Sequence, residues 1–163
     1  MRGRAFKLGN NISTDHIIPG RWFRLRSNLP ELAKHLLEDI SPTFVSQVRP
    51  GDFIVAGRNF GLGSSREHAA LIIKTAGVGA ILAQSTARIF FRNAINSGLP
   101  VLICDTSKID EGDELEIDLA KGTVSDITNG TKLSLGKTPE VMLHILEEGG
   151  LVPYIKKYGG FKI

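Results

Sequence analysis

"DFIVAGRNFGLGSSREHAALIIKTAGVGAILAQ", residues 52–84, contains two short apolar runs separated by a glycine-rich loop and a helical pattern that stops at Gly77. Apolar runs of this length are typical of buried strands, and a glycine commonly ends a helix. The next residues repeat the pattern, with a helix expected over 86–98 and a strand over 99–105. Strand, helix, strand, helix, strand with short links is typical of right-handed crossovers on a parallel sheet. We therefore predict an α/β fold with a parallel βαβαβ core.

The segments on either side of this core are expected to add further elements to one domain spanning 1–163. Alternation of polar and apolar residues predicts antiparallel hairpins over 113–135, with turns at Lys121-Gly122 and Asn129-Gly130. The remaining expectations are a first strand over 2–8, a long loop over 9–28, helices over 29–40, 41–48 (capped by Ser41) and 140–150, and no clear period over 152–163.

Composition limits the classes of function. The 163 residues are 42% hydrophobic and 23% charged, with a net charge of +3 and no basic block, so nucleic acid is not the expected partner. No apolar run approaches the roughly 18 residues of a membrane span, and the first residues lack a signal-peptide pattern. We expect a cytoplasmic protein without a membrane partner. Cys104 is the only cysteine, so no metal site is expected on this chain.

The glycine-rich loop is the first candidate site. Ser64, Ser65 and Arg66 follow Gly61 and Gly63, after a strand and at the start of a helix. Ligands of open α/β sheets bind at the carboxyl ends of strands, and helix N-termini favour anions. Alternatively, Ser64 is only a helix cap that forms a capping box with the glutamate at position 67. That alternative leaves Ser65 and Arg66 unexplained.

"STDHIIPGRWFRLR", residues 13–26, is the second candidate. Its three arginines, including Arg24 and Arg26, alternate with aromatic and aliphatic residues, which fits a half-buried strand, an arm that folds over an acid, or a solvated basic face. Thr14 and Asp15 belong to a polar cluster before them. A third arginine-bearing segment is the helix over 86–98. Arg88 near its start either reaches the site or lies at the surface, and the surface position is the expectation.

Three segments, "STDHIIPG", "GRNFGLGSSREHAA" and "STARIFFRNAINSGLPV", together resemble the small, swivelling domain of the aconitase superfamily. The length and the order of the segments resemble members in which this domain is a free-standing small subunit. The resemblance implies a single swivelling β/β/α domain over 1–163. It covers residues 2–104 well and the remainder loosely.

The resemblance also implies roles for individual residues. Ser64 matches the family's catalytic base, a serine alkoxide that removes the proton alpha to a carboxylate. Ser65 and Arg66 match groups that bind a substrate carboxylate, and Thr14 and Asp15 match a segment that shapes the site. Two further arginines belong to the substrate-reading loop: Arg26 lines up with a carboxylate-binding arginine, and Arg24 precedes it.

In this family, elimination of the hydroxyl group needs a Lewis acid, a [4Fe–4S] cluster held by three cysteines. A chain with one cysteine cannot hold it, so the resemblance implies a large catalytic subunit that carries the cluster. The implied reaction is isomerisation of 2-isopropylmalate and 3-isopropylmalate, by dehydration and rehydration, in leucine biosynthesis. The alternative is homoaconitate hydration or that of a related di- or tricarboxylate. Outside this family, a carboxylate-binding module without catalysis and an RNA-binding module are further hypotheses.

Overall fold

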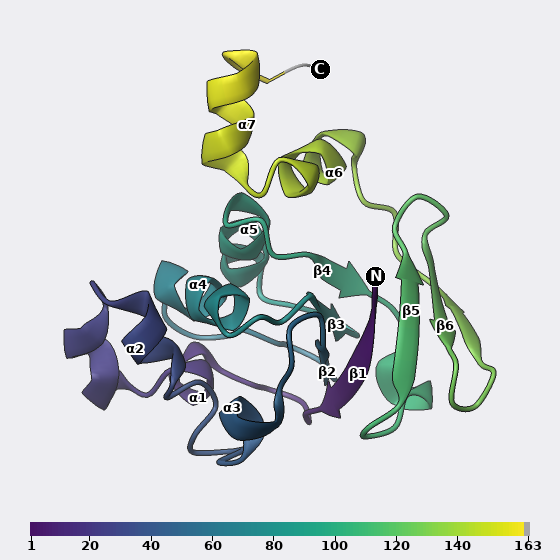
Figure 1. The fold of residues 1–163 in the computed structure, drawn as a ribbon, viewed down its shortest axis with the longest axis horizontal. Helices are drawn as coiled ribbons and strands as arrows, with labels where there is room; N and C mark the ends of the chain where they lie inside the picture. The colour runs from purple at the N-terminus through teal and green to yellow at the C-terminus, as the bar shows by residue number, and fades with distance from the viewer. Residues whose placement is uncertain (162–163) are drawn as a thin grey trace.

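The computed structural model describes residues 1–161, and its centre is a seven-stranded mixed sheet in the order β4-β3-β2-β1-β5-β6-β7 (Figure 1). Four strands run parallel, and three antiparallel strands extend the sheet beyond β1. The strands are β1 (Arg2–Lys7), β2 (Phe53–Ala56), β3 (Ala80–Ala83), β4 (Val101–Ile103), β5 (Glu114–Asp118), β6 (Thr123–Asp126) and β7 (Lys132–Ser134). The predicted α/β class, with its parallel core and its hairpins, is confirmed.

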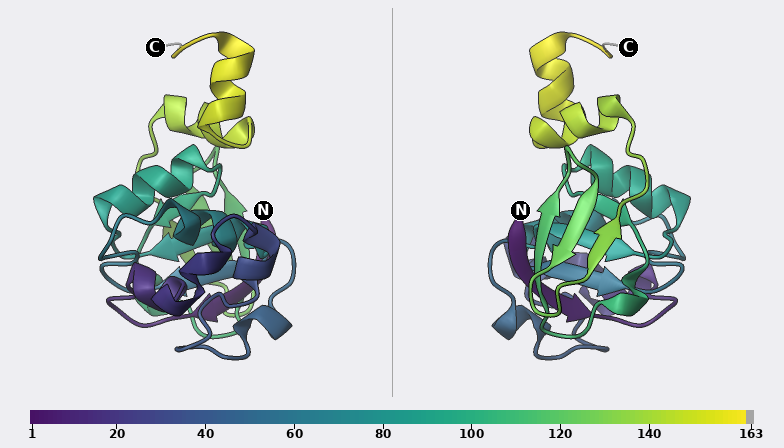
Figure 2. Two further views of the ribbon diagram at one scale, coloured as in Figure 1. Left: turned by 90° about the vertical axis from the view of Figure 1, so that its left-hand side faces the viewer. Right: turned by 90° about the vertical axis from the view of Figure 1, so that its right-hand side faces the viewer.

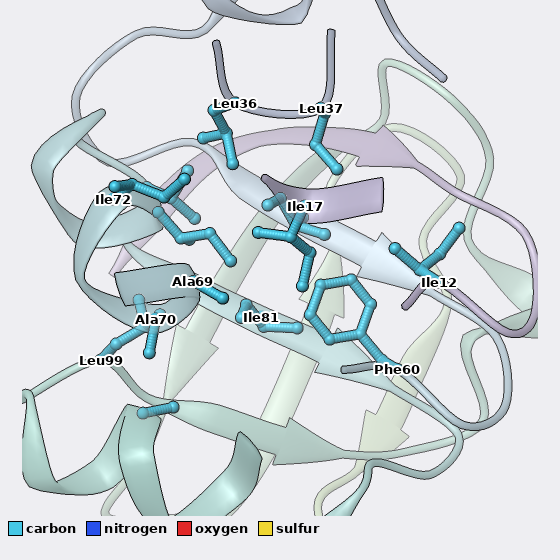
Figure 3. Close-up of a cluster of buried hydrophobic side chains, with 14 of the residues drawn as sticks. Ile12, Ile17, Leu36, Leu37, Phe60, Ala69, Ala70, Ile72, Ile81 and Leu99 are labelled. Carbon is cyan, nitrogen blue, oxygen red and sulfur yellow. The ribbon is translucent and has the colours of Figure 1, made fainter. Parts of the chain in front are cut away.

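Both faces of the parallel strands are buried, each by a different part of the chain. Successive side chains of a strand point to opposite faces, so Ile54 joins the core beneath the helices and Phe53 joins the core on the other face. Figure 3 shows the first core, where Ile17, Phe60 and Ile81 meet. The second core is completed by β5–β7, which lie in front of the parallel strands in the right-hand view of Figure 2.

The two crossover helices, α4 (Glu67–Thr75) and α5 (Arg88–Asn96), lie on the same face because β2, β3 and β4 follow one another in one direction across the sheet. Both helices therefore begin at the edge where the parallel strands end. The other helices are α1 (Thr14–Ile17), η1 (Gly20–Leu25), α2 (Leu29–Ala33), α3 (Phe44–Gln47), η2 (Thr106–Lys108), α6 (Glu140–Glu147) and α7 (Leu151–Tyr158). None of the helices within residues 1–161 combines the length and apolar character needed to cross a membrane.

Four of the predicted boundaries are wrong. The loop predicted over 9–28 contains α1, capped by Ser13, and the 3₁₀ helix η1, so residues 20–25 are not a strand. The helix predicted over 29–40 ends at Ala33, because Leu37 has a φ of +59° and donates its N–H to Ile17 O at 3.0 Å. The other two errors concern α3, whose N-cap is Thr43 rather than Ser41, and α7, which was not predicted.

Asp126, at the end of β6, is a buried carboxyl group with only 2% of its surface exposed. Its Oδ1 accepts hydrogen bonds from the backbone N–H groups of Thr128 (2.9 Å) and Asn129 (3.2 Å). No donor from elsewhere in the described chain reaches Oδ2. Burial raises the pKa of the Asp126 carboxyl, and the neighbouring Asp113 carboxyl raises it further. The folded protein therefore holds a proton here at a pH at which the unfolded chain has released it.

A group with a raised pKa stabilises the fold at acid pH, and that stabilisation is lost as the pH rises through the folded-state pKa. Asp126→Asn keeps the Oδ1 acceptor and replaces the ionisable oxygen Oδ2 with an uncharged amide group. We expect Asp126→Asn to raise the Tm at pH 8 by about 3–6 °C, and to change it little at pH 4. Thermal unfolding at pH 4 and at pH 8, followed by circular dichroism, measures the change in Tm.

Asp118→Asn is the matched control in the same hairpin, since a backbone hydrogen bond from Lys121 lowers the pKa of the Asp118 carboxyl. Its substitution should leave the Tm at pH 8 unchanged or slightly lower. A lower Tm for Asp126→Asn at pH 8 would contradict the raised pKa of the Asp126 carboxyl.

Candidate functional site

Three loops that follow β1, β2 and β3 lie side by side at the carboxyl edge of the parallel strands. Short parallel bridges pair Ser13 with Leu62 and Phe60 with Thr86. Backbone hydrogen bonds reinforce them, from Thr14 N to Leu62 O at 2.8 Å and from Ala87 N to Phe60 O at 2.9 Å. Residues far apart in the sequence are thus brought to one place.

Gly61 allows the middle loop to pass over α5. Its φ is +76°, and a Cβ atom added there would lie 2.2 Å from Phe90 Cγ. We expect Gly61→Ala to lower the free energy of unfolding by about 2–4 kcal/mol, from backbone strain and overpacking together. Urea unfolding measures this.

Gly112→Ala is the matched control, because Gly112 has a φ of +84° with nothing within 4 Å of an added Cβ. It therefore isolates the backbone strain, and its cost should be about 1 kcal/mol. If both variants lower the free energy of unfolding equally, the contact with Phe90 contributes nothing to the cost of Gly61→Ala.

A pocket of about 310 Å³ lies between these loops and the start of α5. Its polar side combines Thr14 with the Ser64-Ser65-Arg66 segment, and its other side is the first turn of α5 with Asn93 one turn later. Thr14 fixes the loop by donating its hydroxyl to Ser64 O at 3.0 Å. The full lining is Thr14, Gly61, Gly63, Ser64, Ser65, Arg66, Ala87, Arg88, Ile89, Phe90 and Asn93.

Neither serine is a helix cap, so the capping-box alternative is wrong. Helix α4 begins at Glu67, and its N-cap is Arg66, with no side-chain hydrogen bond to the first turn. Both serines are exposed at the pocket, and within residues 1–161 no hydrogen bond engages either hydroxyl. Helix α5 also lacks a side-chain cap, since its N-cap residue is Ala87. Two helix N-termini with unpaired N–H groups therefore approach one pocket, which favours an anion there.

Arg66 is held rigidly at the edge of the pocket. Its Nη2 forms an ion pair with Asp15 Oδ1 at 2.6 Å, and its Nη1 donates to Ile18 O at 3.1 Å. The Arg66 side chain is 21% exposed, whereas that of Asp15 is 64% exposed. The structure thus brings Thr14, Asp15 and Arg66 together with the two serines, although Asp15 contacts the guanidinium rather than the pocket.

Arg24 and Arg26, by contrast, are not among the residues that line the pocket. The guanidinium of Arg24 lies over the Trp22 ring at 5.6 Å, and that of Arg26 lies over the Phe23 ring at 4.8 Å. Phe23 in turn packs edge-on against His68, with 5.9 Å between the ring centroids. The 3₁₀ helix η1 therefore reaches the start of α4 through an aromatic contact.

Glu38 anchors η1 from the other side. Its carboxylate accepts hydrogen bonds from Trp22 Nε1 and from Arg21, and it contacts His35 Nδ1 at 2.8 Å. The Trp22 ring stacks on the His35 ring at 3.5 Å. These contacts hold the chain as a helical turn where the alternating pattern predicted a strand or a flexible arm.

The sequence did not identify Ile89 and Asn93 as pocket residues. Arg88 is exposed, as expected, and as the first residue of α5 it also lines the pocket, which was the alternative for this residue. Ile89 is 52% exposed there, which is unusual for a large aliphatic residue on a helix of the core. A usable signal was the spacing of Ile89 and Asn93, which places both on one face of a helix that starts at the site.

The described residues include no group of three or more His, Cys, Asp or Glu side chains that could hold a metal ion. Cys104 is buried, and burial raises the pKa of its thiol to about 11, with a further contribution from Asp105. A neutral, buried thiol is a poor metal ligand. The side chains of the described part of the chain therefore do not fit an iron–sulfur cluster.

Comparison with known proteins gives matches over nearly the whole chain. A family model described as the aconitase C-terminal domain matches residues 41–105. The chain is 64% identical over 163 residues to 3-isopropylmalate dehydratase small subunit 2 of Archaeoglobus fulgidus, covering 100% of this chain and 99% of that protein. It is 53% identical over 157 residues to the methanogen homoaconitase small subunit of Methanothermobacter thermautotrophicus, covering 96% and 91% of the two chains.

The fold is also similar to a crystal structure of 3-isopropylmalate dehydratase from Methanocaldococcus jannaschii. The TM-score is 0.93 at 44% sequence identity, and the match covers 97% of this chain and 94% of that chain.

Proposed function

Since this chain belongs to the aconitase family of dehydratase small subunits, we propose that it is the small subunit of a hydro-lyase that isomerises 2-isopropylmalate and 3-isopropylmalate. The reaction is dehydration followed by rehydration, in leucine biosynthesis. A separate large subunit completes the enzyme.

The observation that carries this proposal is the composition of the pocket at the carboxyl edge of the sheet. Arg66 offers N–H donors that suit a carboxylate, and Ile89 with Phe90 offers an apolar surface. An isopropylmalate has both kinds of group, two carboxylates and a branched alkyl chain. The pocket thus provides for the charged and the apolar parts of one molecule.

Ser64 is the proposed catalytic base. A hydroxyl is a weak base unless positive charge stabilises its alkoxide, and here Arg66 and the N-terminus of α4 follow it directly in the chain. In this role the Ser64 oxygen takes the proton alpha to a substrate carboxylate and returns it in the reverse reaction. Ser65 and Arg66 hold that carboxylate in place meanwhile.

The [4Fe–4S] cluster belongs to the large subunit in this proposal, because the described residues of this chain do not fit it. Loss of the hydroxyl group is assigned to that partner. The small subunit provides proton transfer from carbon and recognition of the substrate.

Anaerobic reconstitution with candidate large subunits tests the proposal. We expect the chain alone to be inactive, and the complex to turn over 3-isopropylmalate faster than homoaconitate or citrate. A tricarboxylate would need a further cation where Ile89 and Phe90 lie. Activity of the isolated chain would contradict the proposed need for a large subunit. A preference for homoaconitate would contradict the assignment of isopropylmalate as the substrate.

A further inference from the structure

We infer that Arg88 is a substrate-binding residue that receives the second carboxylate of the dicarboxylate, opposite the carboxylate held by Arg66. The inference rests on the proposed function and assigns a specificity-determining role to a residue of the same pocket.

Arg88 and Arg66 reach the pocket from different crossover helices. Arg66 is the N-cap of α4, which follows β2, and Arg88 is the first residue of α5, which follows β3. Because β2 and β3 are parallel neighbours, both helices start at the same edge of the sheet. The two arginine residues therefore line different walls of one pocket of about 310 Å³.

The charges of these two arginines are not equally available. Arg66 is already paired with the largely exposed Asp15 carboxylate at 2.6 Å, and one of its amino groups is bound to Ile18 O. No ion pair or hydrogen bond within residues 1–161 engages the Arg88 side chain, which is exposed. A dianion that enters this pocket thus meets one cation that already has a carboxylate partner and one that has none among the described residues. Electrostatic complementarity assigns the second negative charge to Arg88.

The neighbours of Arg88 fit such a ligand. Ile89 is the next residue and exposes its side chain to the same pocket, so an alkyl group and a carboxylate of one small molecule can be bound side by side. Arg92 lies one turn later on α5 and is also exposed, but it does not line the pocket. A comparison of Arg88 with Arg92 can therefore distinguish a role in the pocket from a general effect of positive charge on the surface of α5.

Steady-state kinetics of the reconstituted complex test the inference with Arg88→Ala, Arg88→Lys and the matched control Arg92→Ala. We expect Arg88→Ala to raise the KM for 3-isopropylmalate about 10- to 100-fold with a smaller effect on kcat. Arg88→Lys should recover part of the affinity, because lysine keeps the charge but loses the bidentate geometry. Arg92→Ala should behave as the unsubstituted chain does.

Two outcomes of the kinetics would overturn the inference. Equal KM changes for Arg88→Ala and Arg92→Ala would show a general charge effect. Weaker assembly of Arg88→Ala with the large subunit, at an unchanged KM, would show that Arg88 contacts the partner protein instead of substrate.

A titration of the isolated chain with 3-isopropylmalate, followed by NMR of the arginine Nε–H groups, separates this inference from the proposed function. If no large subunit gives activity, the proposed function fails. The Arg88 role then stands if the Arg88 resonance shifts and Arg88→Ala weakens binding at least 10-fold. It fails if the Arg88 resonance does not move, or if Arg88→Ala and Arg92→Ala bind alike.

Discussion

Ser64→Ala should lower kcat of the reconstituted enzyme by about 10²–10⁴-fold, the usual contribution of a positioned general base. The Ser64 hydroxyl is exposed at the pocket, unengaged by other described residues, and its backbone oxygen is fixed by Thr14. Removal of the hydroxyl therefore removes the proposed proton acceptor without disturbing a structural hydrogen bond. Steady-state kinetics with 3-isopropylmalate, at equal occupancy of the large subunit, measure the loss.

Ser65→Ala is the matched comparison, since the two serines are adjacent, exposed and part of the pocket lining. Its proposed role is carboxylate binding, so the KM should rise more than kcat falls. A larger loss of kcat for Ser65→Ala than for Ser64→Ala would reverse the two roles. If Ser64→Ala retained full turnover, the chain would act as a binding module only. Size-exclusion chromatography should show that both variants still assemble with the partner.

Local sequence patterns were enough to predict the parallel core. The apolar runs around Ile54 and Ile81 are too short and too apolar for anything but buried strands, and Gly77 marks the end of the helix between them. The Asn129-Gly130 turn was equally informative for the hairpin of β6 and β7. These features depend on residues a few positions apart, so the sequence alone reveals them.

The errors arose where a distant contact overrides the local pattern. Leu36 and Leu37 fit a helical stripe, but the N–H of Leu37 bonds to Ile17 O and ends the helix early. Trp22 and its neighbours alternate as in a strand, but Glu38 and His35 hold them in a 3₁₀ turn. Helix α7 was not predicted because it contains Pro153, and proline usually interrupts a helix. In α7 this proline lies in the first turn, where it costs no hydrogen bond.

The site was predicted only in part, because some of its residues are brought together by contacts between distant parts of the sequence. Ser64, Ser65 and Arg66 are consecutive and could be recognised together, whereas Arg88 joins them only because β3 lies beside β2. The alternative in which Ser64 is only a helix cap is wrong because the helix starts later, at Glu67, with Arg66 as its N-cap. The second wall of the pocket is therefore formed by residues that follow a neighbouring strand of the sheet, and not by neighbours of Ser64 in the sequence.

Arg66→Lys should lower kcat/KM by about 10²-fold, although it preserves the charge, because the guanidinium has several partners at once. One Nη is bound to Asp15 and the other to Ile18 O, which leaves further N–H groups of the same planar group for a substrate carboxylate. A lysine ammonium has three donors without a fixed plane, so it cannot keep both structural contacts and also bind the carboxylate in bidentate geometry. Kinetics of the reconstituted enzyme with 3-isopropylmalate measure the loss.

Arg58→Lys is the matched control, because Arg58 lies in the same loop after β2 but does not line the pocket, and it should leave kcat/KM unchanged. Asp15→Asn tests the other half of the ion pair. With the carboxylate removed, Arg66 keeps its charge but loses the contact that orients it, so a smaller loss of about 10-fold is expected. In the double variant the two effects should be less than additive, since both act on the orientation of one guanidinium. Full additivity would mean that Asp15 acts independently of Arg66, and the proposed geometry of carboxylate binding would then be wrong.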